Sequence, residues 1–115
     1  MRIPKRFILH GHTINVREVE KLKSNAFGEY DDAKEQITIA HKVEADDELI
    51  TLTSVQMEHT FWHEVIHAFQ WHTKGKYDEA EAQAYAGLML ELIKTSGIKI
   101  DPNTIHEPIN STYDD

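Results

Sequence analysis

The 115-residue chain contains no cysteine. Disulfide bonds and thiolate metal sites are therefore excluded, and the strong metal ligands that remain are histidine and the carboxylates. No apolar run approaches the length of a transmembrane helix, and the apolar stretch after the basic residues at the start is far too short for a secretory signal. We therefore expect a cytoplasmic protein with no membrane partner.

Positive charge is also scarce. Lysine and arginine together number 12 against 20 aspartates and glutamates, which gives a net charge of -8. Because no basic stripe is present, nucleic acid is not expected as a partner. The length suits one domain with a single modest core, which we place at residues 1–97. The prolines and acidic residues of 98–115 predict a C-terminal arm or tail.

Glycine and proline are absent from residues 47 to 74. Within this segment apolar residues recur at spacings of three and four, which predicts a half-buried helix. These apolar positions are Val55, Phe61, Trp62, Val65, Ile66 and Phe69. The same segment carries the most informative motif of the chain, His63-Glu64-Val65-Ile66-His67.

An HExxH motif on a helix can supply two metal ligands and a base. Residues four apart lie about 40° apart around the axis and about 6 Å along it, so both imidazoles can reach one ion. Imidazole nitrogen suits zinc, and Glu64 can take a proton from the activated water, which is the chemistry of a metalloprotease. Composition alone would produce such a motif in about one chain in twenty. The alternative is a buried helix whose two histidines form local hydrogen bonds.

A catalytic zinc normally takes three protein ligands, so a third is needed. Residues 77–92 read as a second helix, which Gly97 would close at its C-terminus. Asp78 followed three residues later by Glu81 is typical of a capping box. Glu79 and Glu81 would then point about 200° apart around the helix, so only one of them can be the ligand.

Two segments around the motif resemble a known family. The resemblance covers about residues 27–92. The second helix is similar to the E-x-x-A-N-x-F-A-x-x-L-L segment that follows HExxH in ImmA/IrrE-like zinc metallopeptidases, a branch of the gluzincins. The matching run here is Glu79-x-Glu81-Ala82-Gln83-x-Tyr85-Ala86-x-Leu88-Met89-Leu90, and upstream Gly28-Glu29-Tyr30-Asp31 leading into Gln36-Ile37-Thr38-Ile39 resembles the family's hairpin.

The resemblance implies a set of site residues. His63, His67 and Glu79 would bind Zn²⁺, with Glu64 as the catalytic base and Glu81 as the reserve ligand. Gln83 stands where the family has asparagine. The family's substrates are peptides or proteins, often a repressor-type regulator.

Other histidines are less suited to this site. His72 does not fit the metzincin spacing, and His59 lies about 12 Å along the helix from His67, too far to share its ion. We expect His59 at the surface or as a hydrogen-bond partner of the ligands. The remaining histidines are expected at the surface, although any of them can in principle polarise a substrate carbonyl: His10, His12, His41 and His106.

The fold class expected from these patterns is α+β. A small, mainly antiparallel sheet would cover the active-site helix, and the second helix would pack beside it. Residues 7–16 are strand-like with a kink or turn at Gly11, and residues 26–30 and 36–41 predict a hairpin. Residues 19–22 are ambiguous, with helix as one interpretation. The acidic residues 44–48 predict a solvated loop that caps the helix through Asp46 or Asp47.

Several large apolar side chains are expected in the core, because they recur at helical spacing. They are Trp62, Trp71, Leu88, Met89 and Leu92.

Three classes of function are compatible with the sequence. The favoured one is a zinc-dependent metallopeptidase that hydrolyses peptide bonds with a zinc-activated water and Glu64 as general base. The second is a catalytically silent zinc-binding regulatory or interaction protein. The third is a structural domain with a fortuitous HExxH motif. The sequence does not identify a physiological substrate.

Overall fold

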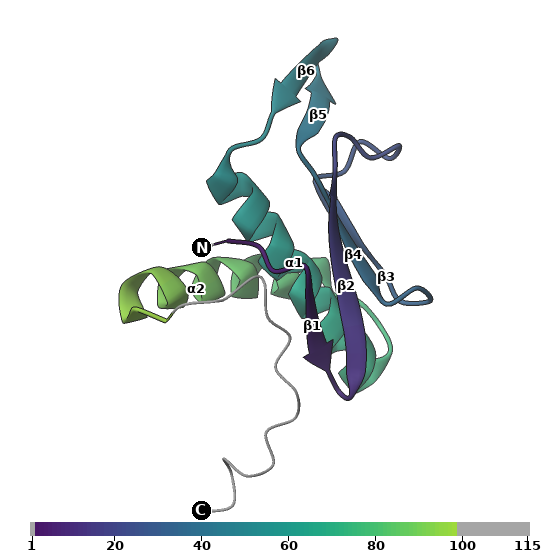
Figure 1. The fold of residues 1–115 in the computed structure, drawn as a ribbon, viewed down its shortest axis with the longest axis vertical. Helices are drawn as coiled ribbons and strands as arrows, with labels where there is room; N and C mark the ends of the chain where they lie inside the picture. The colour runs from purple at the N-terminus through teal and green to yellow at the C-terminus, as the bar shows by residue number, and fades with distance from the viewer. Residues whose placement is uncertain (1, 99–115) are drawn as a thin grey trace, which may run out of the picture.

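The computed structural model describes residues 2–98. Six strands in two small sheets are followed by two packed helices, so the predicted α+β class is confirmed (Figure 1). The arm or tail predicted for residues 98–115 lies outside the described residues, except for Ile98. Neither helix described within residues 2–98 is both long enough and apolar enough to cross a membrane.

The main sheet has four strands in the order β1-β2-β4-β3. The strands are β1 (Arg6–Leu9), β2 (His12–Val19), β3 (Gly28–Asp31) and β4 (Gln36–Ala40). The outer pairs, β1 with β2 and β3 with β4, are antiparallel hairpins, whereas the central pair of β2 and β4 is parallel. The hairpin predicted for residues 26–30 and 36–41 is confirmed, and the strand-like residues 7–16 belong to a second hairpin that turns at Gly11. Strand β3 forms one edge of the sheet.

The core lies between this sheet and the first helix. Side chains alternate between the faces of a strand, so Ile14 and Val16 of β2 and Ile37 and Ile39 of β4 all face inward. They pack in one cluster with Phe61 and Val65 of the first helix. The sheet therefore fixes the position of the helix that carries the HExxH motif.

The second sheet corrects two predictions. Residues 44–48 are not a solvated loop but part of a hairpin of β5 (Lys42–Ala45) and β6 (Glu48–Thr51), which stands beyond the main sheet (Figure 1). Asp46 and Asp47 have φ angles of 51° and 63° and form its tight turn instead of capping a helix. Aspartate tolerates this left-handed conformation, which a two-residue hairpin turn requires. The ambiguous residues 19–22 are not helical, because β2 runs to Val19 and irregular chain follows.

Both helices have well-formed ends. Helix α1 (Ser54–Lys74) begins with a capping box between Thr53 and Gln56 and ends at Gly75, whose φ of 67° suits glycine. Helix α2 (Glu79–Ser96) has Asp78 as its N-cap, which accepts a hydrogen bond from the Glu81 backbone N–H. It ends at Gly97, as predicted.

The apolar residues of α2 are only partly in the core. Its buried face consists of Ala82, Ala86, Leu90 and Ile93, whose small alanines allow close approach to α1. Leu88 and Leu92 are 58% and 50% exposed, and Trp71 of α1 is exposed as well, so the prediction that they lie in the core was wrong. The physical reason is that α1 covers only one side of α2, and helical spacing alone does not say which side.

Candidate metal centre

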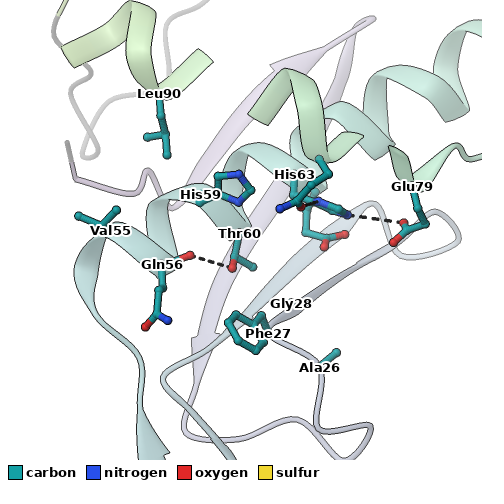
Figure 2. A pocket seen from close by; sticks show the side chains of 12 residues that line it. Ala26, Phe27, Gly28, Val55, Gln56, His59, Thr60, His63, Glu79 and Leu90 are labelled. Carbon is teal, nitrogen blue, oxygen red and sulfur yellow. Dashed lines mark hydrogen bonds and ion pairs between the residues drawn. The ribbon is translucent and has the colours of Figure 1, made fainter. Parts of the chain in front are cut away.

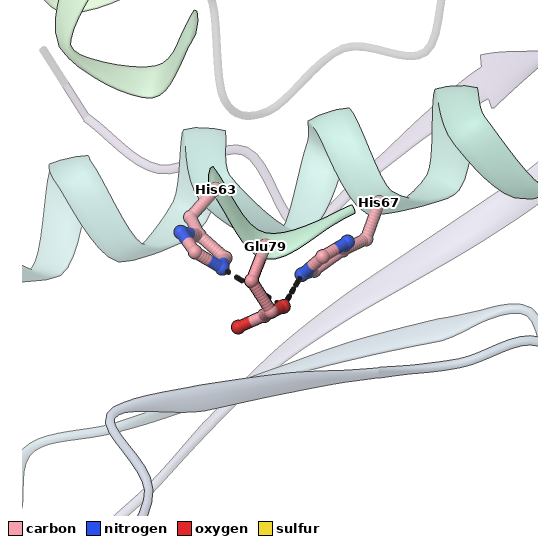
Figure 3. Close-up of side chains that lie close together, drawn as sticks. All are labelled: His63, His67 and Glu79. Atoms are coloured by element: carbon pink, nitrogen blue, oxygen red, sulfur yellow. Dashed lines mark ion pairs between the residues drawn. The ribbon is translucent and has the colours of Figure 1, made fainter. Parts of the chain in front are cut away.

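His63 and His67 lie one turn apart on α1, and their ring centroids are 4.7 Å apart. Glu79, the first residue of α2, lies across from them. Its Oε1 atom is 3.5 Å from His63 Nε2 and in direct contact with His67 Nε2 (Figure 3). One ligand atom from each of the three residues lies within 4.8 Å of the others. Two helices thus bring together a His-His-Glu group that can hold a metal ion.

The hydrogen bonds of the two histidines suit such a role. Gln83 Oε1 lies 2.9 Å from His63 Nδ1, and Gln70 Oε1 lies 2.8 Å from His67 Nδ1. A carboxamide oxygen can only accept, so each Nδ1 carries the proton and each Nε2 presents its lone pair to the centre. Metal-binding histidines are commonly oriented in this way. The three side chains therefore suit a metal ion in tautomer as well as in position.

Gln70 joins the site to the segment that precedes α2. It is only 2% exposed. Its Nε2 donates to the Asp78 carbonyl at 3.0 Å and to Glu81 Oε1 at 2.8 Å, while its Oε1 accepts from the Asp78 N–H at 3.1 Å. Because Glu79 follows Asp78, these bonds help to place the third side chain of the group. The sequence analysis missed Gln70, although its spacing of three residues from His67 was a usable signal.

The structure brings Glu79, not Glu81, beside the histidines. The Glu79 side chain is 78% exposed and borders the group on its open side. Glu81 instead accepts hydrogen bonds from Gln70 and, at 3.3 Å, from Lys74. These bonds hold the pKa of Glu81 below its usual value. The Glu81 carboxylate, the reserve ligand, is thus hydrogen-bonded to Lys74 and Gln70.

Glu64 lies against the same group and is 6% exposed. Burial, followed by repulsion from Glu79 and Glu29, raises the pKa of Glu64 to about 8, although a hydrogen bond from the Tyr30 backbone acts in the opposite direction. A carboxyl group whose pKa is close to the working pH can both take up and release a proton.

Two hollows meet at the candidate centre. The larger has a volume of about 530 Å³ and the smaller about 260 Å³, and Gly28, Glu64 and Glu79 border both. The larger hollow runs along α1 past His59 and Thr60, with Phe27 and Gly28 opposite (Figure 2). The group is therefore open to a ligand on two sides.

Close approach of β3 to α1 depends on Gly28. A Cβ atom at this position would lie 2.5 Å from Thr60 Cγ2 and 3.0 Å from the Thr38 carbonyl oxygen. Any larger residue would push the edge strand away from the helix. Gly28 thereby keeps β3 beside Glu64.

Two tyrosines line the smaller hollow. Tyr77 packs the edge of its ring against His67 at a centroid distance of 5.2 Å and stacks on Trp71. Its hydroxyl donates to Asp32 at 2.6 Å, and burial together with this bond raises its pKa. The Tyr30 hydroxyl is buried and has no hydrogen-bond partner in the described part of the chain. No sequence signal pointed to Tyr77, because it reaches Asp32 only through the tertiary fold.

The other histidines are placed mostly as expected. His59 borders the larger hollow outside the His-His-Glu group, and burial followed by the proximity of His63 lowers its pKa. His10, His12 and His41 are exposed, as predicted. His106 lies outside the described residues.

Comparison of the chain with protein-family models, curated proteins and solved structures found no match in any of the three.

Proposed function

We propose that the chain is a zinc-dependent metallopeptidase, with His63, His67 and Glu79 as zinc ligands. The observation that carries the proposal is the convergence of these three side chains beside the buried Glu64, at the junction of two hollows. When bound, zinc supplies a Lewis acid that activates water and polarises a peptide carbonyl. The resemblance of the two helices to ImmA/IrrE-like peptidases points in the same direction.

Glu64 is the general base in this proposal. It accepts the proton from the attacking water and then passes it to the amine of the leaving peptide. Its burial and the carboxylate of Glu79 favour the protonated form, so it releases the proton readily only where a cation offsets both effects. Gln70 and Gln83 hold the histidine rings in the orientation that the reaction needs.

Strand β3 provides a place for an extended peptide. Within residues 2–98 it pairs with no strand other than β4, so its opposite edge has no neighbouring strand, although the Tyr30 backbone N–H donates to Glu64. Gly28, Glu29 and Tyr30 of this strand border the smaller hollow, next to Glu64 and Glu79. A peptide added to this edge by backbone pairing would run past the candidate centre. We therefore propose that the substrate is an unfolded or extended segment of a protein.

The deciding experiment is Glu64→Gln. This variant should retain zinc, because Glu64 is not a ligand, and should lose peptide hydrolysis by about 10²-fold or more, the range that a positioned base supplies. Zinc content is measured by elemental analysis and hydrolysis with a broad peptide library. Glu91→Gln, an exposed change on α2, is the matched control and should leave both unchanged.

Two results would contradict the proposal. If Glu64→Gln were as active as the wild type, Glu64 would not be the general base. A zinc-loaded wild type that cleaves nothing in the library would favour the catalytically silent zinc-binding protein.

A further inference from the structure

A second group of histidines lies outside the candidate peptidase centre. His10 and His12 flank Gly11 in the turn between β1 and β2, and His72 lies in the last turn of α1. The ring of His72 is 5.7 Å from that of His10 and 5.3 Å from that of His12, measured between centroids. We call these three residues the turn histidines. They bring the hairpin turn and the end of α1 together.

Two buried polar atoms beside the turn histidines have no hydrogen-bond partner among residues 2–98. One is His72 Nε2 and the other is Glu35 Oε2. Glu35 Oε2 lies 2.8 Å from His12 Nδ1, but this contact does not have the geometry of a hydrogen bond. Buried polar atoms are nearly always satisfied, so unsatisfied ones in the same cluster need an explanation. A cation would satisfy both the imidazole nitrogen and the carboxylate oxygen.

We propose that the turn histidines, with Glu35, form a second metal site for a divalent late transition metal such as zinc. Imidazole nitrogen suits Zn²⁺, Ni²⁺ and Cu²⁺, whereas Ca²⁺ and Mg²⁺ require oxygen ligands. His12 and His72 are the central ligands, and His10 and Glu35 complete the set. The site needs no catalytic role, because it would act by linking the hairpin turn to α1.

Metal binding at this site requires a small rearrangement. Within residues 2–98, His63, His67 and Glu79 are the one group whose ligand atoms all lie within 4.8 Å. Rotation of the exposed rings of His10 and His12 would bring their nitrogen atoms closer to His72. Rotation of exposed side chains is fast and needs no movement of the backbone.

The two sites are separate. His72 follows His67 by five residues, which places it about 140° away around the axis of α1. His72 therefore faces the hairpin turn, while His67 faces Glu79. Removal of one set of ligands should leave the other intact, and the second site does not depend on peptidase activity.

The test uses a variant that lacks the first site, His63→Ala/His67→Ala. Titration with zinc against a chromophoric chelator should still show about one equivalent bound, and this zinc should raise the melting temperature. Adding His72→Ala or His12→Ala should weaken the remaining binding at least tenfold, while a large excess of Mg²⁺ or Ca²⁺ should not compete. Circular dichroism verifies that each variant is folded.

His41→Ala is the matched control. His41 Nε2 lies 2.8 Å from Glu18 Oε1, a pairing like that of His12 with Glu35, but within residues 2–98 no other histidine ring contacts His41. In the background that lacks the first site, this change should leave zinc binding unaltered. If His41→Ala weakened zinc binding as much as His72→Ala does, zinc would be bound nonspecifically by surface histidines. This result would overturn the proposal.

A second measurement covers the case in which the variants do not fold. Imidazole nitrogen resonances of the wild-type chain are followed by NMR as zinc is added. The resonances of His12 and His72 should shift over the same range of zinc concentration, up to about two equivalents. If they do not move, or if the variant without the first site binds no zinc, the second site does not exist.

Discussion

Two carboxylates only two positions apart serve different purposes at the start of α2. Glu79 faces His63 and His67, whereas Glu81 turns toward Gln70 and Lys74. The difference arises because side chains two residues apart in a helix leave its axis in nearly opposite directions. The chemistry of the site therefore depends on the register of a single helical turn.

This register predicts that one of two matched variants loses zinc affinity and that the other loses only stability. Glu79→Ala should lower zinc affinity at the first site by at least about 10²-fold, because a ligand is lost. Glu81→Ala should retain zinc and lower the melting temperature only slightly, because Asp78 still caps the helix. Zinc titration of both variants in a His72→Ala background isolates the first site.

The reverse result would change the assignment. If Glu81→Ala abolished zinc binding and Glu79→Ala did not, the third ligand would be Glu81, and the register inferred from the family resemblance would be shifted by two residues.

At the scale of whole elements, the crossing of β3 and α1 determines how the site is enclosed. The backbone of β3 approaches the helix so closely that only hydrogen fits at Gly28. The contact on the helix side is Thr60, whose hydroxyl donates to the Gln56 carbonyl at 2.8 Å. The methyl group of Thr60 is thus the atom that a larger residue would meet first.

Gly28→Ala should consequently destabilise the protein by about 1–3 kcal/mol, the usual cost of an added group in a packed site. Peptide hydrolysis should fall as well, because β3 borders both hollows. The free energy of unfolding is measured by urea denaturation.

Removing the opposing methyl group provides the control. Gly28→Ala/Thr60→Ser should recover part of the lost stability, since serine lacks Cγ2 but keeps the hydroxyl bond to Gln56. Absence of any recovery would mean that the clash with the Thr38 carbonyl, or a different effect, dominates.

At the scale of the whole molecule, the buried Glu64 makes stability depend on pH. The folded protein holds the Glu64 proton more tightly than the unfolded chain, since the pKa rises from 4.5 to about 8 on folding. The stability due to this group is fully present below pH 4.5 and is lost as the pH rises through about 8. A bound cation would oppose this effect by attracting the carboxylate.

For the metal-free protein, the free energy of unfolding of Glu64→Gln relative to that of the wild type should therefore increase between pH 5 and pH 8. The slope should reach up to about 1.4 kcal/mol per pH unit, the free energy of one pKa unit. Urea denaturation in the presence of a chelator measures it at each pH. If the difference in free energy of unfolding between variant and wild type stays constant across this range, Glu64 is ionised throughout. Added zinc should reduce the slope of this difference against pH.

Features that depend on neighbouring residues could be predicted from the sequence. The spacing of His63 and His67 placed both on one side of a helix, because the period of the helix is fixed by its backbone. The caps at Asp78 and Gly97 and the hairpin of β3 and β4 were likewise local patterns, and the structure has them where they were predicted.

Features that depend on contacts between distant segments could not be predicted without the three-dimensional fold. The acidic residues 44–48 form a hairpin because β5 and β6 pair with each other, which their charge pattern did not reveal. Leu88 and Leu92 are exposed because α1 covers the opposite side of α2. The positions of Glu79 beside His67, and of His72 beside His12, required the packing of α1 against α2 and the hairpin turn. Local spacing fixes which way a side chain leaves its own element, but the packing of elements decides what it meets.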